Sequence, residues 1–198
     1  MKQLILLTIC LSASFGTSGN WEIDANKSYV GFSSVKNKVI TENHTFKKLS
    51  GTVSSSGKAR IIISLASVDT LIPIRNERMR AILFEVEKYP EAKITAELKP
   101  EEFAKLSAGE NTKTEIPMSI NLHGVDLSKK VLVKVTRGSG DDYQVRSLEP
   151  VIVHAAHFNL SEGLEALRQI AGLKSIDLSV PVTFDLKLIK SSISGVSL

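Results

Sequence analysis

The chain has 198 residues, of which 42% are hydrophobic and 23% are charged, and its formal net charge is +4. This length is ample for one hydrophobic core, so a single domain is expected. Lys and Arg are interspersed with Asp and Glu and form no basic arm, which argues against a nucleic-acid-binding protein. No apolar run reaches the roughly 20 residues that a membrane-spanning helix needs.

Residues 1–19 have the pattern of a secretory signal peptide. Lys2 provides a positive charge, Leu4–Leu11 is an apolar run broken only by Thr8, and small residues follow. We expect cleavage between about residues 14 and 20, and a periplasmic or secreted product. Cys10, the only cysteine, lies in the apolar run and would be removed with it. The alternative, a buried first strand or helix, is less favoured because the run has no amphipathic period.

Residues 20–190 are expected to form the domain, and residues 191–198 a short tail. In the first half, short runs rich in strand-forming residues predict strands at Ser28–Val35, Phe46–Val53, Arg60–Val68 and Ala92–Leu98. Ile74–Val86 interrupts this series because it is rich in helix formers, and the proline before it suits a first helical turn.

The second half continues the strand pattern. Ile116–Leu122 and Val131–Val135 alternate apolar and polar residues and flank a turn at Gly124–Asp126. Tyr143–Phe158 is long enough to hold a bend or a break at Pro150.

A helix and the clearest strand complete the chain. Ser161–Ala171 has an apolar stripe, with Ser161 as the expected N-cap and Gly172 as the stop. Asp177–Lys187 alternates strictly, with apolar residues at even positions and polar residues at odd ones. Pro181 lies on its polar face and removes one ladder donor, which indicates a bulge or an edge.

About eight mostly antiparallel strands with two short helices define a mainly β fold, either a barrel or a sandwich. Long strands with one apolar face favour a barrel closed on itself. An eight-stranded barrel is just wide enough to be filled by side chains or to hold one slender ligand, and the alternation fits both interiors.

Five segments in the right order resemble the YceI-like family, over essentially Trp21 to Lys190. They are Trp21–Asp24 with Ser28–Phe32; Phe46–Val53; the central stretch Val68–Thr70, Arg75–Arg80 and Phe84–Pro90; Phe158–Gly163; and Val180–Leu186.

This resemblance implies a single elongated eight-stranded antiparallel lipocalin-like barrel. Its interior would hold an amphipathic isoprenoid lipid, with a polyprenyl chain or a quinone tail, and members are commonly exported. The expected apolar walls of the tunnel are Phe32, Ile120, Val133, Val182, Phe184 and Leu186.

The chain departs from the family's pattern at two places. Many members carry Asp and His where Asn76 and Arg78 stand, and an acid-rich stretch where Leu83–Val86 stands. If those groups contact a ligand, the departure implies a different head group.

The cluster Arg75, Arg78 and Arg80 has two interpretations. One is a solvated helix face. The other places Arg75 or Arg78 at the mouth of the barrel, where it would pair with a phosphate or another polar head group.

Catalytic and metal-binding patterns are weak. A metal site needs three or four converging ligands, and His154 and His157 are three apart on a predicted strand, which puts them on opposite faces. No histidine is placed to complete a triad with Ser64, Ser67 and Asp69. We therefore expect no catalytic residue, no metal and no cofactor other than a bound lipid.

The favoured function is an exported, non-enzymatic carrier or sequestering protein for a long isoprenoid lipid. One alternative is a structural or stress-related interaction domain with a filled core, and another is an enzyme acting on a lipid-like substrate. A cavity that a long chain can enter separates the first from the second, and converging polar groups deep within it would favour the third. The sequence leaves a homodimer open.

Overall fold

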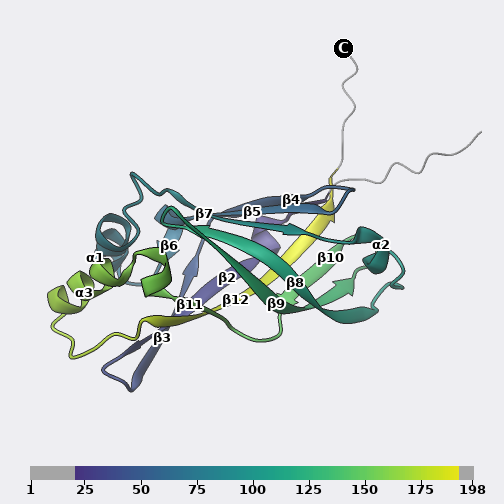
Figure 1. Ribbon diagram of the computed structural model, residues 1–198. Coiled ribbons are helices and arrows are strands. Elements are labelled where there is room, and N and C mark those ends of the chain that lie inside the picture. Colours follow the sequence, from purple (N-terminus) through teal and green to yellow (C-terminus); the bar gives the residue numbers. More distant parts are fainter. Residues whose placement is uncertain (1–20, 192–198) are drawn as a thin grey trace, which may run out of the picture.

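The computed structural model describes residues 21–191. These residues form one antiparallel sheet that closes into an eight-stranded barrel with a few short helices, as Figure 1 shows. The barrel closes because β1 pairs with both β4 and β12. In order around it are β1 (Trp21–Ile23), β4 (Leu49–Val53), β5 (Lys58–Ser64), β7 (Glu91–Glu97), β8 (Asn111–Leu122), β9 (Val125–Arg137), β10 (Tyr143–Ser147) and β12 (Ser179–Lys190).

The predicted mainly β fold and closed barrel are confirmed. The expected signal peptide and Cys10 lie outside the described residues, as does all of the tail beyond residue 191.

At one end of the barrel, four further strands extend the sheet beyond the eight named above: β2 (Tyr29–Lys36), β3 (Ile40–Phe46), β6 (Val68–Asp69) and β11 (Val151–His154). Along β12 the neighbours change from β10 to β11 on one side and from β1 to β2 on the other. β3 pairs with β2 and with the short β6. Consecutive pairs such as β1 and β2, or β3 and β4, therefore act as single long strands with a break.

The prediction of one strand over Phe46–Val53 was wrong. The strand is interrupted at Lys47–Lys48, so Phe46 ends β3 and Leu49 begins β4. Most of β3 was not predicted, because its sequence does not alternate apolar and polar residues. The reason is that its inward positions include Glu42 and His44, which line the interior where a hydrophobic residue is normally found.

The irregularity expected at Pro181 is present. Regular pairing between β2 and β12 stops at Phe32 and Val182, and one isolated bridge joins Lys36 to Ile176 further along. Between these pairs, three residues of β2 face five residues on the β12 side. The pairing of β2 with the β12 side is therefore irregular near Pro181, which is expected because proline has no backbone N–H to donate.

Helices cover one end of the barrel, on the left in Figure 1. α1 (Pro73–Arg78) continues as the π-helical turn η3 (Met79–Leu83), and α3 (Ser161–Ile170) packs against η3. The predicted helix at Ile74–Val86 is confirmed over most of its length, and Pro73 occupies its first turn. The short helices elsewhere are η1 (Ala25–Lys27), η2 (Leu65–Ser67), α2 (Pro100–Phe103) and η4 (Ala155–Phe158).

The predicted N-cap of α3 was wrong, whereas its predicted stop at Gly172 is confirmed. Ser161 is the first helical residue, and Leu160 takes the N-cap position with no side-chain capping bond. At the other end Gly172 has a φ of +63°. Its N–H donates to the Gln169 carbonyl, and the Leu173 N–H donates to that of Arg168, both at 3.0 Å. This is a Schellman motif, which needs a left-handed residue at Gly172.

No helix within residues 21–191 is long and apolar enough to cross a membrane.

Candidate ligand-binding cavity

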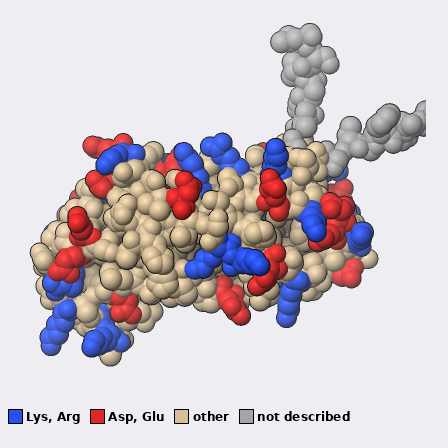
Figure 2. Space-filling model, in the orientation of Figure 1, with Lys and Arg blue, Asp and Glu red and all other residues tan. Residues whose placement is uncertain are grey.

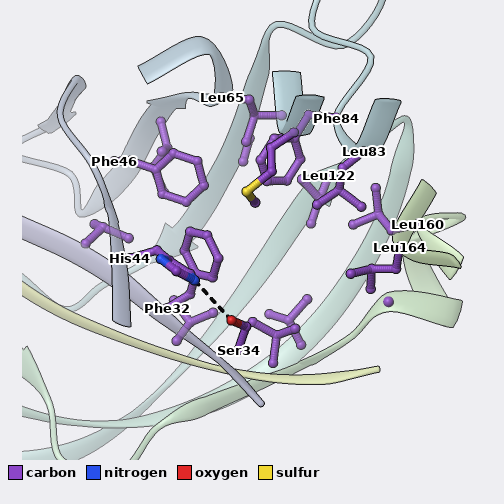
Figure 3. A pocket seen from close by; sticks show the side chains of 18 of the residues that line it. Phe32, Ser34, His44, Phe46, Leu65, Leu83, Phe84, Leu122, Leu160 and Leu164 are labelled. Carbon is purple, nitrogen blue, oxygen red and sulfur yellow. Dashed lines mark hydrogen bonds between the residues drawn. The ribbon is translucent and has the colours of Figure 1, made fainter. Parts of the chain in front are cut away.

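A cavity of about 500 Å³ occupies the helix-covered end of the barrel. Such a volume is typical of small-molecule sites, which measure about 300–1,000 Å³. Inward side chains of the strands form most of its walls, and Leu83 of η3 and Leu164 of α3 line its helix-covered side (Figure 3). The walls labelled there are mostly aromatic rings and leucines: Phe32, Phe46, Leu65, Leu83, Phe84, Leu122, Leu160 and Leu164.

Five of the six residues proposed as tunnel walls line this cavity: Phe32, Ile120, Val182, Phe184 and Leu186. Val133 does not. It is fully buried and lines a smaller cavity of about 100 Å³ toward the β1 end of the barrel, which Trp21 and Tyr143 also line. Alternation shows which side chains point inward, but it does not show how far along the barrel axis they lie.

The two cavities are neighbours. Five residues line both of them, namely Ile61, Ile94, Met118, Phe184 and Leu186. A single layer of side chains therefore separates the larger space from the smaller one.

The polar residues of the large cavity gather at one end of it. They are Ser34, Lys36, Glu42, His44, Arg75, Arg78 and Asp177, from β2, β3, α1 and the segment before β12. Exposed lining residues, including Ile72, Ile74, Arg78 and Ala171, mark this end as the opening. The remaining lining residues are apolar, so the cavity has a polar entrance and an apolar body.

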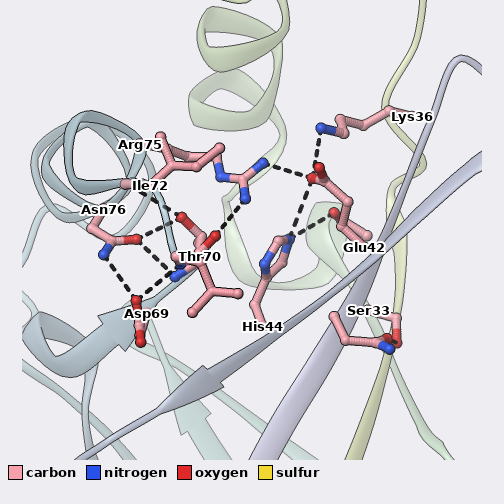
Figure 4. Close-up of polar contacts among 12 residues, drawn as sticks. Ser33, Lys36, Glu42, His44, Asp69, Thr70, Ile72, Arg75 and Asn76 are labelled. Atoms are coloured by element: carbon pink, nitrogen blue, oxygen red, sulfur yellow. Dashed lines mark hydrogen bonds and ion pairs between the residues drawn. The ribbon is translucent and has the colours of Figure 1, made fainter.

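Glu42 is the centre of the polar end (Figure 4). Its Oε2 lies 2.6 Å from Lys36 Nζ and 2.6 Å from Arg75 Nη1. The hydrogen bond from Lys36, together with the charge of Arg75, lowers the pKa of the Glu42 carboxyl. Arg75 also donates from Nη2 to the Thr70 carbonyl at 2.7 Å. The terminal nitrogens of Arg75 therefore have partners within the protein, although its buried Nε has none among the described residues.

Arg78 differs from Arg75 in this respect. It lines the opening, is exposed, and makes no side-chain hydrogen bond or ion pair with residues 21–191. Arg80 points elsewhere, toward the Ala66 carbonyl at 3.4 Å. Of the arginine cluster, Arg78 is thus the free cation at the entrance.

His44 is a lining residue that the sequence did not single out. It is only 5% exposed, its ring lies 5.1 Å from that of Phe32, and Nε2 is 3.0 Å from Ser34 Oγ. Burial, and then the charge of Arg75, lower its pKa, so the ring is neutral at pH 7. Nδ1 is buried without a partner in the described protein. A ligand group with a hydrogen bond to offer or accept would satisfy that atom.

Asn76 supports the loop before α1 and does not line the cavity. Its Oδ1 accepts from Thr70 N at 2.8 Å and from Thr70 Oγ1 at 2.6 Å, and Nδ2 donates to Asp69 Oδ1 at 3.3 Å. Lys47, and then the Leu71 N–H, hold the pKa of Asp69 at about 2. These bonds fix the backbone between β6 and α1.

A family model for the YceI-like domain matches residues 21–188. The chain belongs to the YceI-like family. Among solved structures, it is similar to a polyisoprenoid-binding domain from Saccharophagus degradans implicated in plant cell wall breakdown. The identity is 35%, over 86% of this chain and 98% of that one, with a TM-score of 0.84.

Two more distant structures share the fold. BcnA of Burkholderia cenocepacia is 21% identical, with 83% of this chain and 98% of that chain covered and a TM-score of 0.65. The YCEI protein of Campylobacter jejuni is 16% identical, with 75% and 85% covered and a TM-score of 0.51. No curated protein sequence matches the chain.

Apart from Arg78, the residues that depart from the usual YceI-like pattern lie outside the cavity or keep its wall apolar. Asn76 binds the loop, and Leu83 and Phe84 are buried wall residues. Glu85 has a φ of +45° and places Oε2 2.8 Å from His123 Nε2, at the turn between β8 and β9. Of the positions that depart, Arg78 is the one that brings a polar group to the entrance.

The histidine pair near the end of β11 is not arranged as predicted. A 3-10 helix begins at Ala155, directly after His154, so His157 is not on the strand. The two rings meet edge to face, with 5.1 Å between centroids, so the expectation of opposite faces was wrong. Within residues 21–191, no three His, Cys, Asp or Glu side chains are placed to hold a metal ion.

Proposed function

We propose that this protein is an exported, non-enzymatic carrier or sequestering protein that holds one long isoprenoid lipid in the large cavity. The observation that carries the proposal is the distribution of polarity: an apolar body with polar residues only at the entrance among those described. That arrangement suits a ligand with one polar end and a long hydrocarbon chain. The similar domain from Saccharophagus degradans, described as polyisoprenoid-binding, supports the same ligand class.

Burial of the tail alone provides useful affinity. Each buried CH₂ group contributes about 0.8 kcal/mol, so three isoprene units with their 15 carbons contribute roughly 12 kcal/mol before any cost. Loss of translational and rotational freedom costs at least about 4 kcal/mol. The remainder is therefore at most roughly 8 kcal/mol, which corresponds at best to micromolar binding without a polar contact.

The alternatives have less support. A filled core is disfavoured by the volume of the cavity. A lipid-directed enzyme would place acid, base or nucleophilic groups beside the apolar body, where the described lining residues are hydrophobic.

Native mass spectrometry tests the binding function. Protein purified from its own host should carry a long isoprenoid lipid that is released under denaturing conditions. Lipid-free protein offered a polyprenol should also melt at a higher temperature, because a ligand that binds only the folded state stabilises it. Protein that has no bound lipid and gains no stability from polyprenyl or quinone ligands would contradict the function.

Export has its own test. Mature protein from the cell envelope should begin between about Ser14 and Trp21, as an intact mass or N-terminal sequence would show. Retention of Met1, or a lipid attached to Cys10, on envelope protein would contradict the proposed processing.

A further inference from the structure

Three segments frame the opening of the large cavity, and we call them together the rim: residues 36–42 around the turn between β2 and β3, residues 69–80 through α1, and residues 168–177, which run from the last turn of α3 into the segment after it. Nine large hydrophobic side chains are exposed in the described structure, and six of them lie on the rim: Val39, Ile40, Leu71, Ile72, Ile74 and Ile170. Such a gathering around one opening marks an interaction surface.

The two most exposed of these side chains lie at or directly after residues with left-handed backbone. Leu71 is 86% exposed and has a φ of +64°, with its N–H bound to Asp69 Oδ1 at 3.0 Å. Val39 is 81% exposed and follows Asn37 and Lys38, whose φ angles are +51° and +66°. Left-handed backbone at residues other than glycine is uncommon and is retained where the surroundings stabilise it.

The three segments are joined to one another. Asn37 accepts the Lys174 N–H on its Oδ1 at 2.8 Å and donates its own N–H to the Ser175 carbonyl at 2.9 Å. The bond of 2.6 Å between Arg75 and Glu42 joins α1 to β3. The exposed apolar side chains therefore project from one connected frame.

The rim is also basic. Each of the three segments has a formal net charge of +1, so together they account for the excess of basic over acidic residues in 21–191. Lys38, Arg78 and Lys174 are exposed and make no side-chain bond within the described chain, while the exposed acids are Glu77 and Asp177. Figure 2 shows basic side chains at the lower left, where Figure 1 places the β2–β3 turn and the segment after α3.

We propose that the rim docks on a bilayer that contains anionic phospholipids, with the opening facing the membrane. Exposed aliphatic side chains enter the boundary between head groups and acyl chains, and the surrounding cations meet the phosphates. This rests on the proposed lipid-binding function, since a docked opening lets a tail pass between bilayer and cavity without crossing water. A second copy of the chain is a poorer fit because it would bring the same cations together.

Vesicle co-sedimentation tests the proposal. The full mature chain should partition more strongly onto phosphatidylcholine vesicles with about 30% phosphatidylglycerol than onto pure phosphatidylcholine, and less strongly at high salt. The double variant Val39→Ser with Leu71→Ser should bind the anionic vesicles at least about ten-fold more weakly. Leu148→Ser, an exposed apolar residue outside the rim, should bind like the parent.

Three results would overturn the docking proposal: a folded parent that binds neither vesicle, a double variant that binds as well as the parent, or a double variant that loses only self-association in sedimentation velocity. Native mass spectra of the same samples separate the two functions. Lipid in the cavity without vesicle binding refutes docking alone, whereas vesicle binding by a protein that never holds a lipid refutes the carrier function alone. Thermal melts of each variant confirm that it is folded.

Discussion

At the residue scale, the entrance of the cavity contains two kinds of polar side chain. Lys36 and Arg75 both make short contacts with Glu42. Arg78 and the Nδ1 atom of His44 have no such partners in the described structure. His44 Nδ1 is a buried polar atom without a partner, which is costly unless a ligand or water satisfies it, whereas the exposed Arg78 is free to pair with a charged group of a ligand. We therefore expect the first group to act on stability and the second on binding.

Substitution of the two arginines should separate these roles. Arg78→Gln should weaken binding of an isoprenoid phosphate by roughly three- to ten-fold and leave binding of the uncharged polyprenol unchanged, because it removes a charged donor at a partly solvated site. Arg75→Gln should instead lower the free energy of unfolding by about 1–3 kcal/mol, since Glu42 and the Thr70 carbonyl lose a partner. Ligand titrations and denaturant melts measure the two effects, and equal losses for both ligands in Arg78→Gln would contradict the assignment.

His44 should make the stability depend on pH. Because its pKa is lowered in the folded protein, the unfolded chain takes up a proton near the ordinary value of about 6.5 that the folded chain does not. Stability is complete above that value and falls as the pH drops below it.

In His44→Phe this loss should shrink, so Tm should change less between about pH 7.5 and pH 5.5 than in the parent. The lowered pKa values of Glu42 and Asp69 act at lower pH, below the ordinary range of carboxyls. An unchanged slope in the variant would show that His44 does not titrate in this window.

At the element scale, strands with an apolar inward face were predictable and those with a polar inward face were not. β12 alternates cleanly because its inward residues meet the apolar body of the cavity. β3 carries Glu42 and His44 at inward positions. These polar residues form the entrance, and they also remove the apolar alternation by which a strand is predicted. β1 is three residues long, too short for any period to show. The break at Pro150 was predictable because proline lacks the ladder donor.

The end of α3 provides a test at this scale, since it positions the rim segment that follows. Gly172→Ala should destabilise the protein by about 1 kcal/mol, because alanine is strained at a φ of +63° although no atom lies within 4 Å of its Cβ. Gly172→Asn, which tolerates left-handed backbone better, should lose less. Thermal melts in which alanine is as stable as glycine would contradict the Schellman assignment.

At the scale of the whole molecule, the proposed function depends on a cavity whose volume side-chain patterns do not encode. Ile120, Val182 and Phe184 were expected inside the barrel whether its interior is filled or holds a ligand, and their contacts with a cavity follow from how the strands and helices pack. Val133 shows the limit, because the same alternation placed it inside the barrel but in the smaller cavity. Volume arises from the sum of all packing, so a single periodic strand does not predict it.

A comparison of Val182→Trp with Thr183→Trp tests the central claim, the binding of a lipid in the large cavity, most directly. The lipid content and the melting temperature of each variant are measured. Val182 lines the large cavity, whereas Thr183 next to it on β12 is exposed. In Val182→Trp the indole should occupy the space of the tail, so native mass spectrometry should find the bound isoprenoid reduced while the lipid-free protein keeps its stability. Thr183→Trp should retain the lipid. If Val182→Trp instead melts far below the parent, as overpacking by about 1–3 kcal/mol would cause, and neither protein holds a lipid, the interior is a filled core and the carrier function is contradicted.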